Sequence, residues 1–176
     1  MIIKSKSYKT ECYKGILQYL LRESEQEQGF VISRFLKGDN RDVNALTRQF
    51  MVNETYRKHV RSNSVKLYMD IISFKAEDAK LLTNEKLIKI AKKYIALRSP
   101  KSLSLATVHR NEKSHTHLHF VFSGTHYRTG IANRISREDF KNKVKLPMEE
   151  FQRENYPELK ASEINHQRTL SAKKKW

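Results

Sequence analysis

The sequence between residues 102 and 123 holds two runs of alternating apolar and polar residues, separated by a polar loop. The runs are Ser102–His109 and His117–Ser123. Residues two apart on a strand share a face, so the apolar positions of the second run are predicted to enter a core. His117 and His119 then point to the opposite face. This pattern predicts two adjacent strands with one histidine-bearing face.

The rest of the chain is predicted to supply further strands and covering helices. We expect a strand at Ile2–Lys4, helices at Thr10–Ser24 and Asp42–Met51, a central strand at Val65–Phe74, a helix at Thr83–Leu97, and a helix that opens at Ser136 and is interrupted or restarted by Pro147. The stretch Phe30–Phe35 is ambiguous. Strands and helices do not alternate regularly, which favours an α+β fold with a central antiparallel β-sheet covered by helices.

Three histidines have matched spacing on the two paired runs. If the hairpin folds about its midpoint, His109 lies opposite His117 and diagonal to His119. Three imidazoles then converge on one point, as a metal site requires. Single histidines on a sheet face often only hydrogen-bond to solvent, but three with this spacing favour metal binding. His115 shares the parity of the pair and lies at the loop end, so its membership of the site stays open.

The first predicted helix carries one tyrosine that its apolar stripe does not include. The stripe consists of Tyr13, Ile16, Leu17, Leu20 and Leu21. At about 100° per residue, Tyr19 points roughly 130° away from the centre of the stripe. Gly15, one turn earlier, leaves open space beside the ring. Tyr19 is therefore the leading candidate for tyrosine chemistry; Tyr8 and Tyr13 compete, although Tyr13 is better explained as core.

The charge of the chain points to a polyanionic partner, since 35 Lys and Arg against 19 Asp and Glu give a net charge of +16. The candidate phosphate contacts are Arg57, Lys58, Arg61 and Lys66 before the strand at Val65–Phe74, and Arg128, Arg134, Arg137, Lys141, Lys143 and Lys145 after the histidine hairpin. Tyr56, Tyr127 and Phe140 lie among them and are candidates for stacking on unpaired bases.

Two further features bear on location. No apolar run approaches the roughly 18–20 residues of a membrane span, so membrane insertion is not expected. The single cysteine, Cys12, excludes an internal disulfide and fits a reducing cytoplasm.

The histidines and the tyrosine helix together resemble the relaxases, the mobilisation nucleases of conjugative and mobilisable plasmids within the HUH endonucleases. The first matching motif is a histidine ending one strand, His109, followed by the His-x-His pair His117 and His119 and an apolar strand. The second is Tyr-apolar-x-Arg-Glu, here Tyr19–Glu23. The resemblance covers roughly residues 1–125. It departs from many relaxases at Asn111, where they have an aspartate.

The resemblance implies an HUH endonuclease fold and a site- and strand-specific DNA endonuclease of the bacterial cytoplasm. Tyr19 is then the nucleophile that nicks single-stranded DNA at an origin of transfer and forms a 5′-phosphotyrosyl intermediate. His109, His117 and His119 hold a divalent cation, Mn²⁺ or Mg²⁺ in function, although imidazole ligands favour tighter binding of Zn²⁺ or Ni²⁺. Asp70 is expected to orient a ligand histidine from outside the ligand set.

The resemblance also implies partners for conjugative mobilisation. These are single-stranded origin DNA with a hairpin, accessory mobilisation proteins and a type IV secretion coupling protein. The candidate DNA contacts are Arg22, Arg57, Lys58, Arg61, Arg128 and Arg134. We expect residues 1–160 to form the nuclease domain, and residues 161–176 to be a basic tail leading to a C-terminal region absent from this sequence.

Other functions remain open from the sequence alone. A related HUH replication initiator or transposase would use the same chemistry with a tyrosine after the histidines, where this chain offers Tyr127 and Tyr156. A non-catalytic basic nucleic-acid-binding module with a structural metal would bind DNA without cutting it. A metallohydrolase of a small substrate is disfavoured by the charge.

Overall fold

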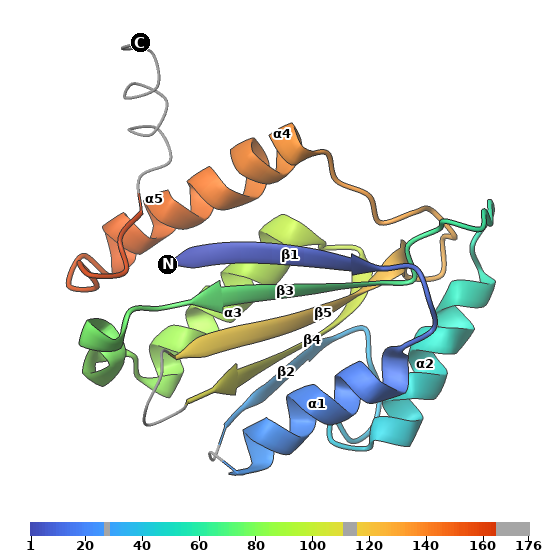
Figure 1. Ribbon diagram of the computed structural model, residues 1–176, viewed down its shortest axis with the longest axis horizontal. Coiled ribbons are helices and arrows are strands. Elements are labelled where there is room, and N and C mark those ends of the chain that lie inside the picture. The colour runs from blue at the N-terminus through green and yellow to red at the C-terminus, as the bar shows by residue number, and fades with distance from the viewer. Residues whose placement is uncertain (27–28, 111–115, 165–176) are drawn as a thin grey trace.

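The computed structural model describes residues 1–26, 29–110 and 116–164, and in these residues five strands form one sheet (Figure 1). The strands are β1 (Ile2–Tyr8), β2 (Val31–Arg34), β3 (Leu67–Ser73), β4 (Ser102–His109) and β5 (His117–His126). Their order is β1-β3-β5-β4-β2, and every neighbouring pair is antiparallel. The predicted antiparallel sheet is confirmed. As predicted for Val65–Phe74, β3 is an interior strand, paired with β1 on one side and with β5, the middle strand of the five, on the other.

The helices begin close to where the sequence places them. They are α1 (Tyr13–Gln26), α2 (Val43–Thr55), α3 (Asn84–Arg98), α4 (Arg137–Asp139) and α5 (Leu146–Asn155), with a 3₁₀ turn η1 (Ala76–Leu81) and a π-helical turn η2 (Phe140–Lys145). Asp42 and Thr83 cap α2 and α3, because their side chains accept hydrogen bonds from backbone N–H groups of the first turn. None of the helices in the described ranges is long and apolar enough to cross a bilayer.

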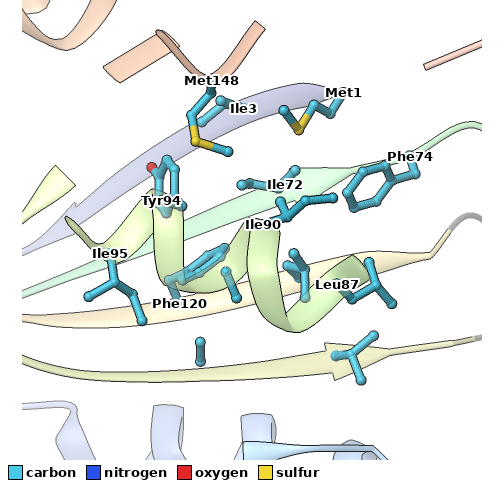
Figure 2. Packing of buried hydrophobic residues seen from close by; sticks show 14 of the residues in the cluster. Met1, Ile3, Ile72, Phe74, Leu87, Ile90, Tyr94, Ile95, Phe120 and Met148 are labelled. Carbon is cyan, nitrogen blue, oxygen red and sulfur yellow. The ribbon is translucent and has the colours of Figure 1, made fainter. Parts of the chain in front are cut away.

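The sheet carries a hydrophobic core on each face. On one face, α1 and α2 pack Leu17 and Phe50 against β4 and β5, in a cluster that includes Val121. On the other face lie α3 and α5, which pack with Phe120 (Figure 2). Because successive residues of β5 alternate between the two clusters, the predicted period-two pattern is confirmed. His119, two residues before Val121, therefore belongs to the face covered by α1.

The last helical segment changes its hydrogen-bonding pattern directly before a proline. Residues 137–155 form α4, η2 and α5 in succession, and Pro147 lies in the first turn of α5. Proline has no N–H to donate to the carbonyl of the preceding turn, so a regular helix is not continued through it without a change of pairing. The predicted interruption at Pro147 is confirmed in this form.

Asp70 lies on the face of the sheet that the histidines do not share. It is fully buried on β3, opposite Phe120 of β5, and its Oδ2 accepts hydrogen bonds from Tyr94 Oη at 2.8 Å and Arg98 Nε at 3.0 Å, both on α3. Burial raises the pKa of this carboxyl, and the charge of Arg98 opposes that rise. The expectation that Asp70 orients a metal-ligand histidine is therefore wrong. Its carboxylate fastens α3 to the sheet.

Breaking this buried pair is expected to destabilise the fold strongly. Arg98→Met leaves the Asp70 carboxylate without its cation, and an uncompensated buried charge costs about 3–5 kcal/mol. Urea unfolding followed by circular dichroism measures the loss. Glu85→Gln, which removes the exposed Glu85–Lys89 pair on the same helix, is the matched control and should leave the midpoint unchanged. Equal midpoints for the two variants would show that Asp70 is neutral or hydrated in the folded state.

Candidate active site

The pairing of β4 with β5 brings the three histidines together. His109 lies directly opposite His117, and Thr107 lies opposite His119, so His109 and His119 are diagonal neighbours. The ring centroids of His109 and His119 are 4.2 Å apart, and those of His117 and His119 are 6.1 Å apart. The predicted register is thus confirmed. His115 and Asn111 lie outside the described residues.

Two of the histidines are oriented by hydrogen bonds that the sequence did not reveal. His109 is buried, and its Nε2 lies 3.0 Å from the backbone oxygen of Leu20 on α1. His117 Nδ1 lies 2.9 Å from Ser73 Oγ, on the neighbouring strand β3. Both partners depend on tertiary contacts, namely the docking of α1 on the sheet and the β3–β5 register. The hydrogen bond between His117 and Ser73 could have been predicted only from the β3–β5 register, which places Ser73 opposite His117.

His119 stays neutral at physiological pH. Burial lowers the pKa of its imidazole to about 3, and the neighbouring His109 and His117 add to the effect. Its Nδ1 is buried and has no hydrogen-bond partner among the described residues. A neutral imidazole is the form that binds a metal ion, because its lone pair is not occupied by a proton. His119 is therefore chemically suited to be a ligand.

The donor set fits a divalent cation in its chemistry, although the rings are not arranged as a finished metal site. Within the described ranges, no three His, Cys, Asp or Glu side chains form a group that could hold a metal ion. His109 and His119 lie instead with their rings tilted by 31° at close separation. Three imidazoles on adjacent strands, two of them oriented by hydrogen bonds, are nevertheless ligands of the kind that bind divalent metals.

Tyr19 lies beside the histidine cluster. Its ring centroid is 5.8 Å from that of His109 and 5.8 Å from that of His119, with both rings meeting it edge-on. The side chain is 45% exposed, whereas its helix neighbours Leu17 and Leu20 are buried. The prediction that Tyr19 leaves the apolar stripe of α1 is confirmed. Its hydroxyl-bearing ring is both accessible and next to the imidazoles.

The competing tyrosines lie elsewhere. Tyr13 is buried against Phe50, and burial raises the pKa of its phenol above the usual range. Tyr8 directs its hydroxyl to Met69, Tyr127 stacks on Phe35, and Tyr156 is buried in the core under α5. Among the described residues, ring contacts with the histidines are made by Tyr19 and by no other tyrosine.

A cleft opens beside the Tyr19 ring. It has a volume of about 610 Å³, and its lining includes Gly15, Arg22 and Arg41 (hereafter the Tyr19 cleft). A methyl group added to Gly15 would meet no atom within 4 Å, which confirms the open space predicted next to the ring. Arg41 precedes α2, and its place in the Tyr19 cleft follows from the docking of the two helices. Two guanidinium groups make the Tyr19 cleft suited to a phosphate chain.

The other predicted DNA contacts divide into exposed and buried residues. Lys58, Arg61, Arg128 and Arg134 are exposed, as phosphate contacts must be. Arg57 is buried: it is paired with Glu54 on α2, and its Nη2 donates to the backbone oxygen of Val65 at 2.6 Å. The expectation that Arg57 binds DNA is therefore wrong. Arg57 instead joins α2 to the start of β3. The nearby Lys58 and Arg61 are exposed and do not have this structural role.

Acidification is expected to destabilise the metal-free protein through His119. Its pKa is about 3 when folded, against an ordinary value of 6.5, so the unfolded chain takes up the proton first as pH falls. The contribution to stability is present above pH 6.5 and is lost progressively toward pH 3. Urea midpoints between pH 7 and 5, measured in EDTA, should fall less steeply for His119→Gln than for the natural chain and for the exposed control His59→Asn. Identical slopes in all three proteins would contradict the prediction.

Comparison with known proteins agrees with this arrangement. A family model of the relaxase MobA/VirD2-like nuclease domain matches residues 19–156, which is most of the chain and includes Tyr19 and the three histidines. No curated protein matches the sequence. Relaxases of this family bind single-stranded DNA, nick it and generally use a divalent metal. The chain belongs to the MobA/VirD2-like relaxases.

Proposed function

We propose that this relaxase nicks one DNA strand at an origin of transfer through attack by Tyr19, for conjugative mobilisation. The observation that carries the proposal is the position of the Tyr19 ring, 5.8 Å from both His109 and His119, at the edge of the Tyr19 cleft. A half-exposed phenol next to two imidazoles and two guanidinium groups has the parts that phosphoryl transfer requires: a nucleophile, ligands for the metal and cations for the phosphate.

The reaction is a transesterification. The Tyr19 oxygen forms a bond to phosphorus as the bond from phosphorus to the 3′ oxygen breaks. The phenol loses its proton, and the departing oxygen gains one to become a 3′-OH. The phosphodiester is exchanged for a phosphotyrosyl ester, so the reverse attack by a 3′-OH can reseal the strand. Because an ordinary tyrosine has a pKa of about 10, its deprotonation needs a nearby positive charge or base.

His109, His117 and His119 are the residues that would hold the divalent cation. When bound, the cation supplies positive charge that polarises the scissile phosphate. We infer Mn²⁺ or Mg²⁺ as the functional ion, and tighter binding of Zn²⁺ or Ni²⁺, because imidazole nitrogen favours the later metals. The hydrogen bonds to Leu20 and Ser73 fix the orientation of two rings, as outer contacts do in metal sites.

The strand approaches this site over a positively charged surface. Arg22 and Arg41 line the Tyr19 cleft. The other exposed cations proposed to contact phosphates are Lys58, Arg61, Arg128 and Arg134. Each phosphate that they neutralise makes affinity more sensitive to salt. We further propose an origin hairpin, accessory mobilisation proteins and a type IV coupling protein as partners in the bacterial cytoplasm, with residues 1–160 as the nuclease domain and 161–176 as a basic tail.

A denaturing gel tests the proposed function. The protein is mixed with labelled single-stranded oligonucleotides tiled across the neighbourhood of its gene, with Mn²⁺ or with EDTA. We expect protein-linked label with Mn²⁺ on the oligonucleotides that contain the nick site, and none with EDTA. Tight, salt-sensitive binding without an adduct on any oligonucleotide would instead support a non-catalytic DNA-binding module. An adduct of equal yield in EDTA would remove the metal from the reaction.

A further inference from the structure

A second hollow lies on the same face of the sheet as the Tyr19 cleft, at the far end of β4. It has a volume of about 380 Å³, and Leu103 and residues of α2 contribute to its lining. Leu103 precedes His109 by six residues on β4, which is about 20 Å at the usual rise of a strand. The hollow is therefore separate from the histidine cluster but on one continuous face with it. We call it the aromatic hollow.

Two stacked rings form a wall of the aromatic hollow. Phe35, which follows β2, and Tyr127, which follows β5, have centroids 5.0 Å apart and planes tilted by 13°. Phe35 is 39% exposed despite being one of the largest apolar side chains. The guanidinium groups of Arg34 and Arg128 lie over these rings, at 5.1 Å from the Phe35 centroid and 4.9 Å from the Tyr127 centroid. The chain thus displays an aromatic pair flanked by cations.

The backbone at this pair is strained. Phe35 has φ of 61° and Arg128 has φ of 57°, and they are the two non-glycine residues with positive φ among those the structure describes. This region is unfavourable for side chains with a Cβ, and such strain is concentrated at ligand sites. Both strained residues line the aromatic hollow, although they are far apart in the sequence.

The rim of the aromatic hollow is rigid and positively charged. Lys37, Arg48 and Arg128 line it, and no acidic side chain does so among the described residues. The loop that carries Phe35 is fastened to α2, because the Lys37 N–H donates to Gln49 Oε1 at 2.8 Å and Gln49 Nε2 donates back to the Lys37 oxygen at 3.0 Å. A fixed loop loses little entropy when a ligand binds.

We propose that the aromatic hollow binds one unpaired base of the DNA strand that reaches Tyr19. The base stacks on the outer face of Phe35 or of Tyr127 and displaces the exposed guanidinium that lies over that ring, which is Arg34 or Arg128. The displaced cation, with Lys37 and Arg48, meets the flanking phosphates. Aromatic faces accept any base, and the cations complement the backbone. Across the 20 Å from His109, a strand with a stacked rise of 3.4 Å needs about six nucleotides, and an extended strand needs fewer. The inference rests on the proposed function, because it takes the same strand as ligand.

An abasic scan of the oligonucleotide tests the proposal. Affinity is measured by fluorescence anisotropy in EDTA, so that no cleavage occurs, while single abasic sites are placed along a strand containing the nick. For the natural chain, one position within about six nucleotides of the nick should weaken binding by about 5- to 100-fold. Phe35→Ala and Tyr127→Ala should lose affinity by a similar factor for the intact strand. Removing the base at the sensitive position should not lower the DNA affinity of these two variants any further.

The controls separate stacking from folding and from catalysis. Tyr127→Phe keeps the ring and should keep the affinity, and Val60→Ala removes an exposed apolar side chain outside the aromatic hollow. Circular dichroism checks that each variant is folded. The control Val60→Ala should form the Mn²⁺-dependent adduct as the natural chain does. A flat abasic scan, or unchanged affinity of Phe35→Ala and Tyr127→Ala, would overturn the base-binding proposal even if the natural chain forms the adduct. Absence of the adduct from the natural chain would instead refute the proposed function.

Discussion

Tyr19→Phe is expected to reduce the Mn²⁺-dependent covalent adduct to background while single-stranded DNA still binds with unchanged affinity. The substitution removes one oxygen and leaves the ring against His109 and His119. Because the side chain is 45% exposed and the phenyl ring is kept, the fold should be unaffected. Adduct yield on a denaturing gel measures the chemical step, and anisotropy measures binding separately.

Tyr8→Phe is the matched control for this experiment. It removes the hydroxyl of a partly buried tyrosine at the end of β1, away from the histidine rings, so the adduct should form as in the natural chain. An adduct that persisted in Tyr19→Phe would move the nucleophile to another tyrosine. Tyr127 and Tyr156 would then be tested first, because they follow the histidines in the sequence, as the alternative of a replication initiator or transposase requires.

The sheet and its two faces were predictable because a strand repeats every two residues. The alternation in β5 separated the face that carries Phe120 from the face that carries His117 and His119, although helices cover both faces. A slip of one residue would exchange these two faces, so the alternation also fixes the register. The full length of β1 was not predictable in the same way. Its residues after Lys4 are mostly exposed and polar, and they become a strand by pairing with β3 up to Tyr8. A polar edge strand carries no periodic apolar signal.

The candidate site was predictable where chemistry follows from spacing, and not where it follows from packing. Once the two predicted strands pair, the spacing of His109 from His117 and His119 is enough to place the three histidines next to one another. Asp70 was misassigned because consecutive residues of a strand point to opposite faces of the sheet. Asp70 lies opposite Phe120, one residue away from the position opposite His119. Arg57 was misassigned because charge alone does not reveal that Glu54, one helical turn earlier, pairs with it. Arg41 was missed because the loop before α2 meets α1 only in the folded chain.

The second large effect is expected at the metal ligands. His119→Ala and His117→Ala should each remove Mn²⁺-dependent cleavage, with a loss of metal affinity greater than the about 10- to 100-fold typical for an outer contact. Ser73→Ala, which removes the hydroxyl 2.9 Å from His117 Nδ1, should show a loss within that smaller range. Calorimetric titration with Mn²⁺ and with Ni²⁺ measures affinity, and the denaturing gel measures cleavage.

His126→Ala separates the loss of a ligand from the loss of a histidine. His126 lies on the same strand as His117 and His119 but at its opposite end, and it is partly exposed. The His126→Ala protein should retain both its affinity for Mn²⁺ and its cleavage of DNA. A His119→Ala protein that still cut DNA would remove His119 from the ligand set. Loss of cleavage with full metal affinity would give His119 a different part in the reaction, at the phosphate or at the Tyr19 proton, because its neutral ring contacts Tyr19 directly.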